Sequence, residues 1–169
     1  MRVFAQDESR LGLHQNARRR LTACGTKPVQ MMQTRYEYFW LYAAVEPSSG
    51  ESLVLEMPGL DAHCFQAFLD EFAATYAETL NVLVLDGAGA HISGALSMPE
   101  NVLLVRLPPY CPELNPVERL WQDLKQRMGW ALHESLAAQK ACAARILRDY
   151  SRAHLASLCA FTSVFAPAF

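Results

Sequence analysis

Three acidic residues stand at positions where carboxylates commonly bind metal ions. Asp7 closes a short apolar stretch, Asp86 directly follows the apolar run 82–85, and Glu118 falls in the first turn of a predicted helix. Hard divalent cations such as Mg²⁺ prefer oxygen ligands, so two or three carboxylates and substrate phosphates suffice to hold them. Two such ions, roughly 4 Å apart, activate the attacking oxygen and stabilise the leaving oxygen of a phosphodiester displacement. The three acids together therefore suggest metal-dependent phosphodiester chemistry.

Other kinds of catalytic site lack their motifs in this chain. The sequence contains no Gly-x-Ser-x-Gly elbow, no Walker loop and no Gly-rich dinucleotide turn. Metal-assisted displacement requires no covalent nucleophile, so this pattern agrees with the three acids. The protein's task would be to fix the acids on elements that do not move.

Each acid also has a purely structural interpretation. Asn115 and Glu118 have nearly the spacing of a capping box, and a carboxylate in the first helical turn suits the helix dipole. Asp86 could cap the turn that follows it, and Asp7 alone is only an acid at the end of a strand. His91, five residues after Asp86, is either a plain hydrogen-bonding group or a partner for a ligand carboxylate or a DNA phosphate.

The segment Leu107–Met128 is rigid in its first half and helical in its second. Three prolines, at positions 108, 109 and 112, fix φ and bias the preceding residues away from helix. Asn115 is a favoured N-cap and Pro116 suits the first helical position, so a helix is expected from Pro116 to about Trp130. Its apolar residues form one stripe of a 3.6-residue period: Val117, Leu120, Trp121, Leu124 and Met128.

The elements that must position these residues follow from apolar periodicity and turn residues. Asp61 is a usable N-cap, and a continuous apolar run such as Val82–Leu85 is typical of a strand buried on both faces. The predicted strands are Arg2–Glu8, Leu11–Leu21, Tyr36–Val45, Ser52–Met57 (antiparallel to the one before it), Val82–Leu85 and Val102–Leu107. The predicted helices are Asp61–Leu80, Pro116 to about Trp130 and Leu132–Leu158, with turns at Gly25–Pro28 and, as a turn or short helix, Ala88–Leu96.

This order of elements predicts the fold class. Three or four strands in a meander precede strands that alternate with helices, which indicates an α/β fold with a mixed sheet, antiparallel at first and then parallel, flanked by helices. In such sheets, sites collect beyond the carboxyl ends of the central strands. With 51% hydrophobic residues in 169, the chain can bury one sizeable core, so a single domain over residues 1–169 is expected.

Charge is segregated along the chain although the net charge is only -2. Residues 1–35 and 101–169 have basic balances of +5 and +3, whereas residues 36–100 contain ten acids and no Lys or Arg. Strong autonomous nucleic-acid binding needs extensive phosphate neutralisation, so this chain is not expected to bind DNA tightly alone. Its two basic segments could still line a groove, and Arg18–Arg20 is either a solvated edge or a phosphate contact.

The remaining composition indicates a cytoplasmic protein. No apolar run approaches the roughly 20 residues that span a bilayer, and no signal-peptide core follows Met1. The five cysteines are odd in number and lack zinc-site spacing, which favours free thiols in a reducing compartment. They are Cys24, Cys64, Cys111, Cys142 and Cys159.

Three blocks of the sequence, in this order, carry a resemblance to a known family. They are Phe4–Leu13, Val84–His91 and Leu107–Trp121, which contain Asp7, Asp86 and Glu118 respectively. The blocks resemble the signatures of the DDE catalytic domain of bacterial insertion-sequence transposases of the mariner-like superfamily. The third block, with its Leu-Pro-Pro-Tyr loop, is the most specific of the three.

The resemblance implies a ribonuclease H-like fold and a DNA strand transferase that depends on Mg²⁺ or Mn²⁺, with two ions expected. Asp7, Asp86 and Glu118 would be its catalytic residues and metal ligands. In that family, water cuts the DNA at the element's ends, and the freed 3′-hydroxyl then attacks target DNA, typically at TA. The candidates for DNA contacts are Arg10, His91, Asn115 and Lys125.

The sequence departs from the family pattern in three ways. Gly87 stands where Asn usually follows the second acid, and Cys111 replaces the usual Ser of the proline loop. Family members usually carry helix-turn-helix DNA-binding domains before the catalytic core, whereas here the first catalytic strand begins close to Met1. The helix-turn-helix region is therefore expected to be absent, as in a fragment, a decayed element or a second reading frame joined by frameshifting.

The implied partners are the DNA of the element ends and target, a second copy of the chain in the synaptic complex, and an upstream helix-turn-helix polypeptide. The alternative function is an inactive transposase remnant that binds DNA or a transposase and regulates transposition. The intact acids argue against that alternative, and the missing DNA-binding region argues for it. A cellular nuclease acting on RNA–DNA hybrids would not explain the Leu-Pro-Pro-Tyr loop.

Overall fold

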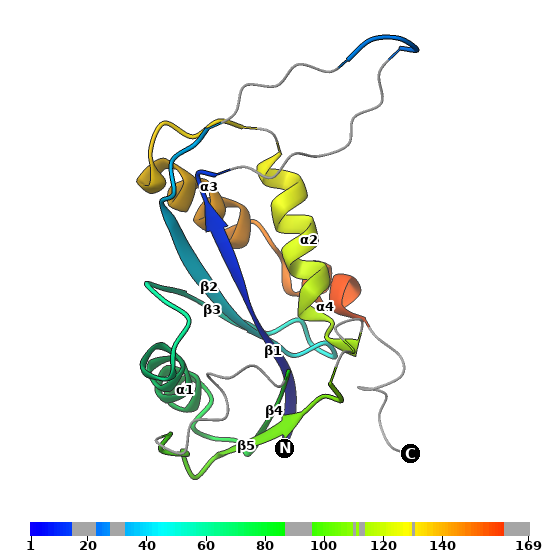
Figure 1. Cartoon of the computed structure of the whole chain (residues 1–169). Coiled ribbons are helices and arrows are strands. Elements are labelled where there is room, and N and C mark those ends of the chain that lie inside the picture. The colour runs from blue at the N-terminus through cyan, green and yellow to red at the C-terminus, as the bar shows by residue number, and fades with distance from the viewer. Residues whose placement is uncertain are drawn as a thin grey trace.

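The computed structural model describes residues 1–14, 23–27, 33–86, 96–109, 111, 114–129 and 131–160. Its centre is a five-stranded mixed sheet with the strand order β3-β2-β1-β4-β5 (Figure 1). The strands are β1 (Arg2–Gly12), β2 (Tyr38–Val45), β3 (Ser52–Met57), β4 (Asn81–Leu85) and β5 (Val102–Arg106). The helices are α1 (Ala62–Thr75), α2 (Val117–Met128), α3 (Leu136–Arg148) and α4 (Arg152–Cys159).

The sheet has the predicted change of direction along the chain. β1, β2 and β3 form an antiparallel meander, in which β3 pairs with β2 from Ser52↔Val45 to Met57↔Trp40. β4 then pairs parallel to β1, and β5 parallel to β4. The prediction of an antiparallel start followed by parallel strands is confirmed, and β1 is the central strand that joins the two halves.

Helices cover the two faces of the sheet with separate cores (Figure 1). α1 packs on one face through aromatic residues, and Phe4 of β1 contacts Phe72 there with ring centroids 5.0 Å apart. On the other face, α2 lies over β1 and β2, with α3 and α4 packed against it. The predicted apolar stripe of α2 is buried in this second core: Val117, Leu120, Trp121, Leu124 and Met128.

β1 is longer than predicted, which corrects the second predicted strand. Leu11 and Gly12 belong to β1 and pair with Phe39 and Tyr38 of β2, so no new strand begins at Leu11. Gly12 permits this close approach, because a Cβ there would lie 2.7 Å from the carbonyl oxygen of Glu37. Residues 15–22 of the predicted second strand lie outside the described residues.

α1 begins as predicted and ends five residues early. Asp61 caps its start, since its Oδ1 accepts a hydrogen bond from the Cys64 backbone N–H at 2.8 Å. The helix stops at Thr75 because the buried amide of Asn81 donates to the carbonyls of Tyr76 and Thr79 at 2.9 and 2.8 Å. These bonds hold the chain in a turn that leads directly into β4.

The predicted helix over residues 132–158 is two helices. Ser135 caps α3 by accepting from the Ala138 N–H at 3.2 Å, and Ser151 caps α4 by accepting from the His154 N–H at 3.1 Å. Serine competes with helix continuation and favours caps, so a new helix begins at Arg152. The predicted turn at Gly25 is present, with φ +81° and a bond from Thr26 N–H to Ala23 O.

Two further expectations bear on the chain's environment. All five cysteines are free thiols, as predicted. In the part of the chain that the structure describes, no helix has the length and apolarity to cross a membrane.

Candidate active site

Asp7 and Asp86 are brought together by the register of β1 and β4. The two strands run parallel, and Ala5 pairs with Val84. That pairing ends at Ala5↔Val84, and Asp7 and Asp86 each follow two residues later on these neighbouring segments. Neighbouring strands lie about 4.8 Å apart, and side chains two residues apart share a face. Because Ala5 lies in the core under α2, Asp7 shares the face that α2 covers, and Asp86 directly follows β4 on the neighbouring strand.

Two buried hydrogen bonds fix α2 on β1 on either side of Glu118. Before Glu118, the Asn115 side-chain Nδ2 donates to the Gln6 carbonyl at 2.8 Å. After it, the Trp121 indole Nε1 donates to Asp7 Oδ2 at 2.9 Å. Glu118 lies between these two ties, in the first turn of α2, and is half-buried. The third acid is therefore held close to the first by direct contacts between their elements.

The charges of Glu118 and Asp86 both raise the pKa of Asp7. Asp7 is only 9% exposed, and burial raises its pKa from 3.8 to about 8, assisted by repulsion from Glu118, Glu8 and Asp86. Repulsion between carboxylates falls with distance, so the effect of Glu118 and Asp86 on this pKa agrees with the register and with the packing of α2. The β1–β4 register, the ties of α2 to β1 and the raised pKa of Asp7 together support the proximity of the three predicted acids.

The α2 N-terminus differs slightly from its prediction. The helix begins at Val117 rather than Pro116, and the Asn115 side-chain Oδ1 accepts from the Val117 N–H at 3.2 Å. The predicted N-cap is therefore displaced: Pro116 occupies the cap position without a side-chain cap bond, and the Asn115 side chain instead holds the first helical N–H. In the described part of the chain, no bond from the Glu118 carboxylate to the Asn115 backbone completes a capping box, which leaves the carboxylate available for another role.

The carboxylate oxygens of the three acids suit a hard cation, although they do not form a preassembled metal site. Among the described residues, no group of three or more His, Cys, Asp or Glu side chains is arranged to hold a metal ion as it stands. Mg²⁺ usually takes only one or two carboxylates and completes its shell with waters and substrate phosphates. Asp7, Asp86 and Glu118 offer carboxylate oxygens, the ligand type that Mg²⁺ and Mn²⁺ prefer, so the donor chemistry fits these ions.

The predicted DNA-contact residues have different surroundings. Asn115 is 4% exposed, and its amide is committed to Gln6 and Val117. Arg10 is exposed, with its guanidinium 5.4 Å from the centre of the Tyr38 ring.

Lys125 is half-buried on α2, seven residues after Glu118 and so on the same side of the helix. His91, Gly87 and Arg18–Arg20 lie outside the described residues.

The sequence did not predict that Trp121 contacts the candidate site through Asp7. Its spacing identifies it only as one member of the apolar stripe, since Leu120 and Leu124 occupy equivalent positions. Nothing in a 3.6-residue period distinguishes an indole that fills a core from one that donates to a carboxylate. The hydrogen bond to Asp7 emerges only when α2 is placed on β1.

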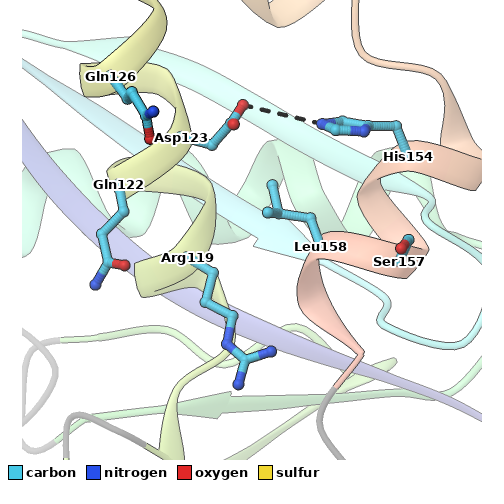
Figure 2. A pocket seen from close by; sticks show the side chains of 7 residues that line it. All are labelled: Arg119, Gln122, Asp123, Gln126, His154, Ser157 and Leu158. Carbon is cyan, nitrogen blue, oxygen red and sulfur yellow. Dashed lines mark ion pairs between the residues drawn. The ribbon is translucent and has the colours of Figure 1, made fainter.

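A polar groove lies between α2 and α4 (Figure 2). It encloses about 480 Å³. Asp123 and His154 point toward each other across it, 3.9 Å apart, and Asp123 also binds Arg127 and Tyr150, each at 2.6 Å. Asp123 is thus already paired within the protein, and Asp7, Asp86 and Glu118 are not among the residues that line this groove.

Comparison with known proteins identifies the family. A family model described as "DDE superfamily endonuclease" matches residues 2–139, well over half of the chain. The chain belongs to this family. A protein of Sinorhizobium fredii described as "Uncharacterized protein y4pE/y4sA" is 38% identical to this DDE family member over 87 residues, which cover 51% of this chain and 64% of that protein.

Solved structures share the fold of this DDE family member. The Mos1 transposase paired-end complex with left transposon end matches 94% of this chain and 51% of the Mos1 chain, with a TM-score of 0.70 and 13% identity. The Mos1 strand transfer complex also gives 0.70, at 14% identity, over 94% and 50% of the two chains. The ribonuclease H-like fold is therefore confirmed. The chain spans about half the length of these Mos1 chains.

Proposed function

We propose that this chain is the catalytic domain of a transposase, which cleaves DNA at the ends of a mobile element and transfers the strands into target DNA. The observation that supports the proposal is that the elements carrying Asp7, Asp86 and Glu118 are neighbours, fixed to one another by strand register and buried hydrogen bonds. Membership of the DDE endonuclease family supports the same reaction class.

In this proposal the three carboxylates hold Mg²⁺ or Mn²⁺, with two ions expected. When bound, such ions activate the attacking oxygen and stabilise the leaving oxygen in phosphodiester displacement. Mos1 supports the choice of metal, since its paired-end complexes were solved with Mn and with Mg. The residues of this chain supply rigidity: β1 and β4 fix the two aspartates, and α2 fixes Glu118 through its ties to β1.

Proton release accompanies metal binding in this proposal. Because the pKa of Asp7 is raised to about 8, its carboxyl group holds a proton at neutral pH before a cation arrives. A ligand carboxylate must be deprotonated, so metal affinity should rise with pH up to about 8. Burial and repulsion from the neighbouring acids raise this pKa, and a bound divalent cation would relieve that repulsion.

The proposed partners are those of a synaptic complex in a bacterial cytosol or nucleoid: the element ends, target DNA and a second copy of the chain. The Mos1 complex with a transposon end supports a DNA partner. Recognition of the ends would belong to a helix-turn-helix polypeptide, because the net charge of -2 is unfavourable for tight DNA binding. Arg10, Lys125 and His91 remain proposed DNA contacts.

Substitution of single acids tests the proposal. Asp86→Asn and Glu118→Gln should abolish Mn²⁺-dependent nicking of plasmid DNA while leaving the circular dichroism spectrum and melting temperature close to those of the wild type. Asp70→Asn and Glu71→Gln, exposed acids of α1, are matched controls that should nick normally.

Unimpaired nicking by Asp86→Asn or Glu118→Gln would refute the assignment of the acids. DNA binding without any nicking by the wild type, even with a separately expressed helix-turn-helix domain, would instead favour the inactive remnant.

A further inference from the structure

We propose that Trp121 is a positioning residue of the candidate metal centre, whose indole N–H holds one oxygen of the Asp7 carboxylate and so fixes the direction in which that carboxylate meets a cation. The inference rests on the proposed function, because it takes Asp7 to be a metal ligand. It adds a residue that neither the three acids nor the family signature includes among the ligands.

The contact has the geometry of a strong hydrogen bond. Nε1 of Trp121 lies 2.9 Å from Oδ2 of Asp7, within the range for an N–H donor and an oxygen acceptor. Trp121 is 2% exposed and Asp7 is 9% exposed, so water competes little for either group. The two residues are 114 positions apart in the chain, and the bond therefore joins α2 directly to the central strand.

An indole suits this position better than the other large donors. Its N–H can only donate and does not titrate, so it constrains the carboxylate and leaves the negative charge in place. An arginine or lysine at this point would neutralise Asp7 and repel a cation. A phenylalanine or leucine would fill the same core and leave the carboxylate oxygen without this donor.

The hydrogen bond from Trp121 restricts the rotation of the Asp7 carboxylate, which is otherwise weakly constrained. Rotation of an aspartate carboxylate about its last bond is broad, so without a bound partner its oxygens can take many directions. One fixed oxygen limits that rotation. Groups that orient metal ligands in this way typically change metal affinity by roughly 10-fold to 100-fold when removed.

The alternative role for Trp121 is core packing alone, since it also lies among Val117, Leu120 and Leu124. Trp121→Phe separates the two roles, because it keeps an aromatic ring in the core and removes the N–H. Trp40→Phe is the matched control: Trp40 is partly buried and packs against the core on the α1 face of the sheet. Asp7→Asn tests the ligand itself.

Isothermal titration calorimetry with Mn²⁺ is the first measurement. We expect the Mn²⁺ dissociation constant to rise by roughly 10-fold to 100-fold in Trp121→Phe, to stay at the wild-type value in Trp40→Phe, and binding to be lost in Asp7→Asn. Wild-type affinity in Trp121→Phe together with loss in Asp7→Asn would overturn the positioning role and leave the proposed function standing. Wild-type affinity in Asp7→Asn would overturn the proposed function itself.

A second measurement does not depend on the folding of Trp121→Phe. In a ¹H–¹⁵N spectrum of the wild-type protein, the indole resonance of Trp121 should shift during a Mg²⁺ titration and saturate at the calorimetric dissociation constant. The Trp40 indole should not move, and neither should that of Trp121 in Asp7→Asn. Saturable Mg²⁺ binding in the wild type with an unmoved Trp121 resonance would refute the inference.

Discussion

Asp7→Asn should stabilise the metal-free protein at alkaline pH, although it removes a proposed catalytic residue. The pKa of Asp7 is raised from 3.8 to about 8 in the folded state, first by burial and then by repulsion from neighbouring acids. Between these two values the folded state binds the proton more tightly than the unfolded state does. The contribution of Asp7 to the free energy of unfolding is therefore fully present below pH 3.8 and is lost as pH rises toward 8.

The size of the effect follows from that difference. Each tenfold change in proton affinity corresponds to about 1.4 kcal/mol, so the rise to about 8 sets a ceiling of about 6 kcal/mol. Relaxation and water penetration reduce such effects for buried groups. At pH 8 we expect Asp7→Asn to be at least about 2 kcal/mol more stable than the wild type. Its side-chain amide oxygen can still accept the Trp121 hydrogen bond.

The assay is urea unfolding followed by circular dichroism at pH 5, 6, 7 and 8 without divalent metal. The difference between wild type and variant cancels the titration of groups that do not interact with Asp7, so it reports Asp7 together with its acidic neighbours. It should be small at pH 5 and grow steadily in favour of the variant as pH rises. Asp70→Asn, at an exposed acid of α1, should show no such trend.

Added Mg²⁺ should reverse the order of stability at pH 8. A ligand that binds only the folded state stabilises it by an amount that grows with the logarithm of the ratio of free ligand to Kd, and the variant lacks one proposed metal ligand. An Asp7→Asn protein that is less stable than the wild type at pH 8 without metal would refute the reasoning. It would mean that the charge of Asp7 is already compensated within the protein.

Two further substitutions test how the elements are held. Asn115→Ala should lower the free energy of unfolding by about 1–3 kcal/mol in urea, because it removes the buried bonds to Gln6 and to the Val117 N–H; an unchanged midpoint would contradict this tie. Gly50→Ala should cost at least about 1–3 kcal/mol, since Gly50 has φ +73° and an added Cβ would lie 1.8 Å from the Arg152 carbonyl oxygen. A melting temperature equal to the wild type would contradict that close contact between the β2–β3 turn and α4.

The sequence predicted most of the fold because most elements are locally encoded. The aromatic spacing of α1 and the apolar stripe of α2 each repeat with the helical period, and β4 is continuously apolar. The errors fall where distant contacts decide. α1 ends at Thr75 because Asn81 takes carbonyls of its last turn, and β1 runs on through Leu11 because β2 offers a partner there.

The candidate site divides in the same way. Asp86 and Glu118 stand at a strand end and in the first turn of a helix as predicted, whereas Asp7, predicted at a strand end, lies in the middle of β1 because β1 continues to Gly12. The role of Trp121 was not predictable, because its hydrogen bond to Asp7 depends on the rotation of α2 and its placement over β1. The same placement commits Asn115, a predicted DNA contact, to the protein interior.

The central claim is that Asp7, Asp86 and Glu118 together bind divalent cations. A crystal of the protein soaked in Mn²⁺, with data collected at the manganese absorption edge, tests it most directly. The account predicts anomalous density within about 2.3 Å of carboxylate oxygens from at least two of these acids. Density absent from this edge of the sheet at saturating Mn²⁺, or present only at other residues, would contradict it.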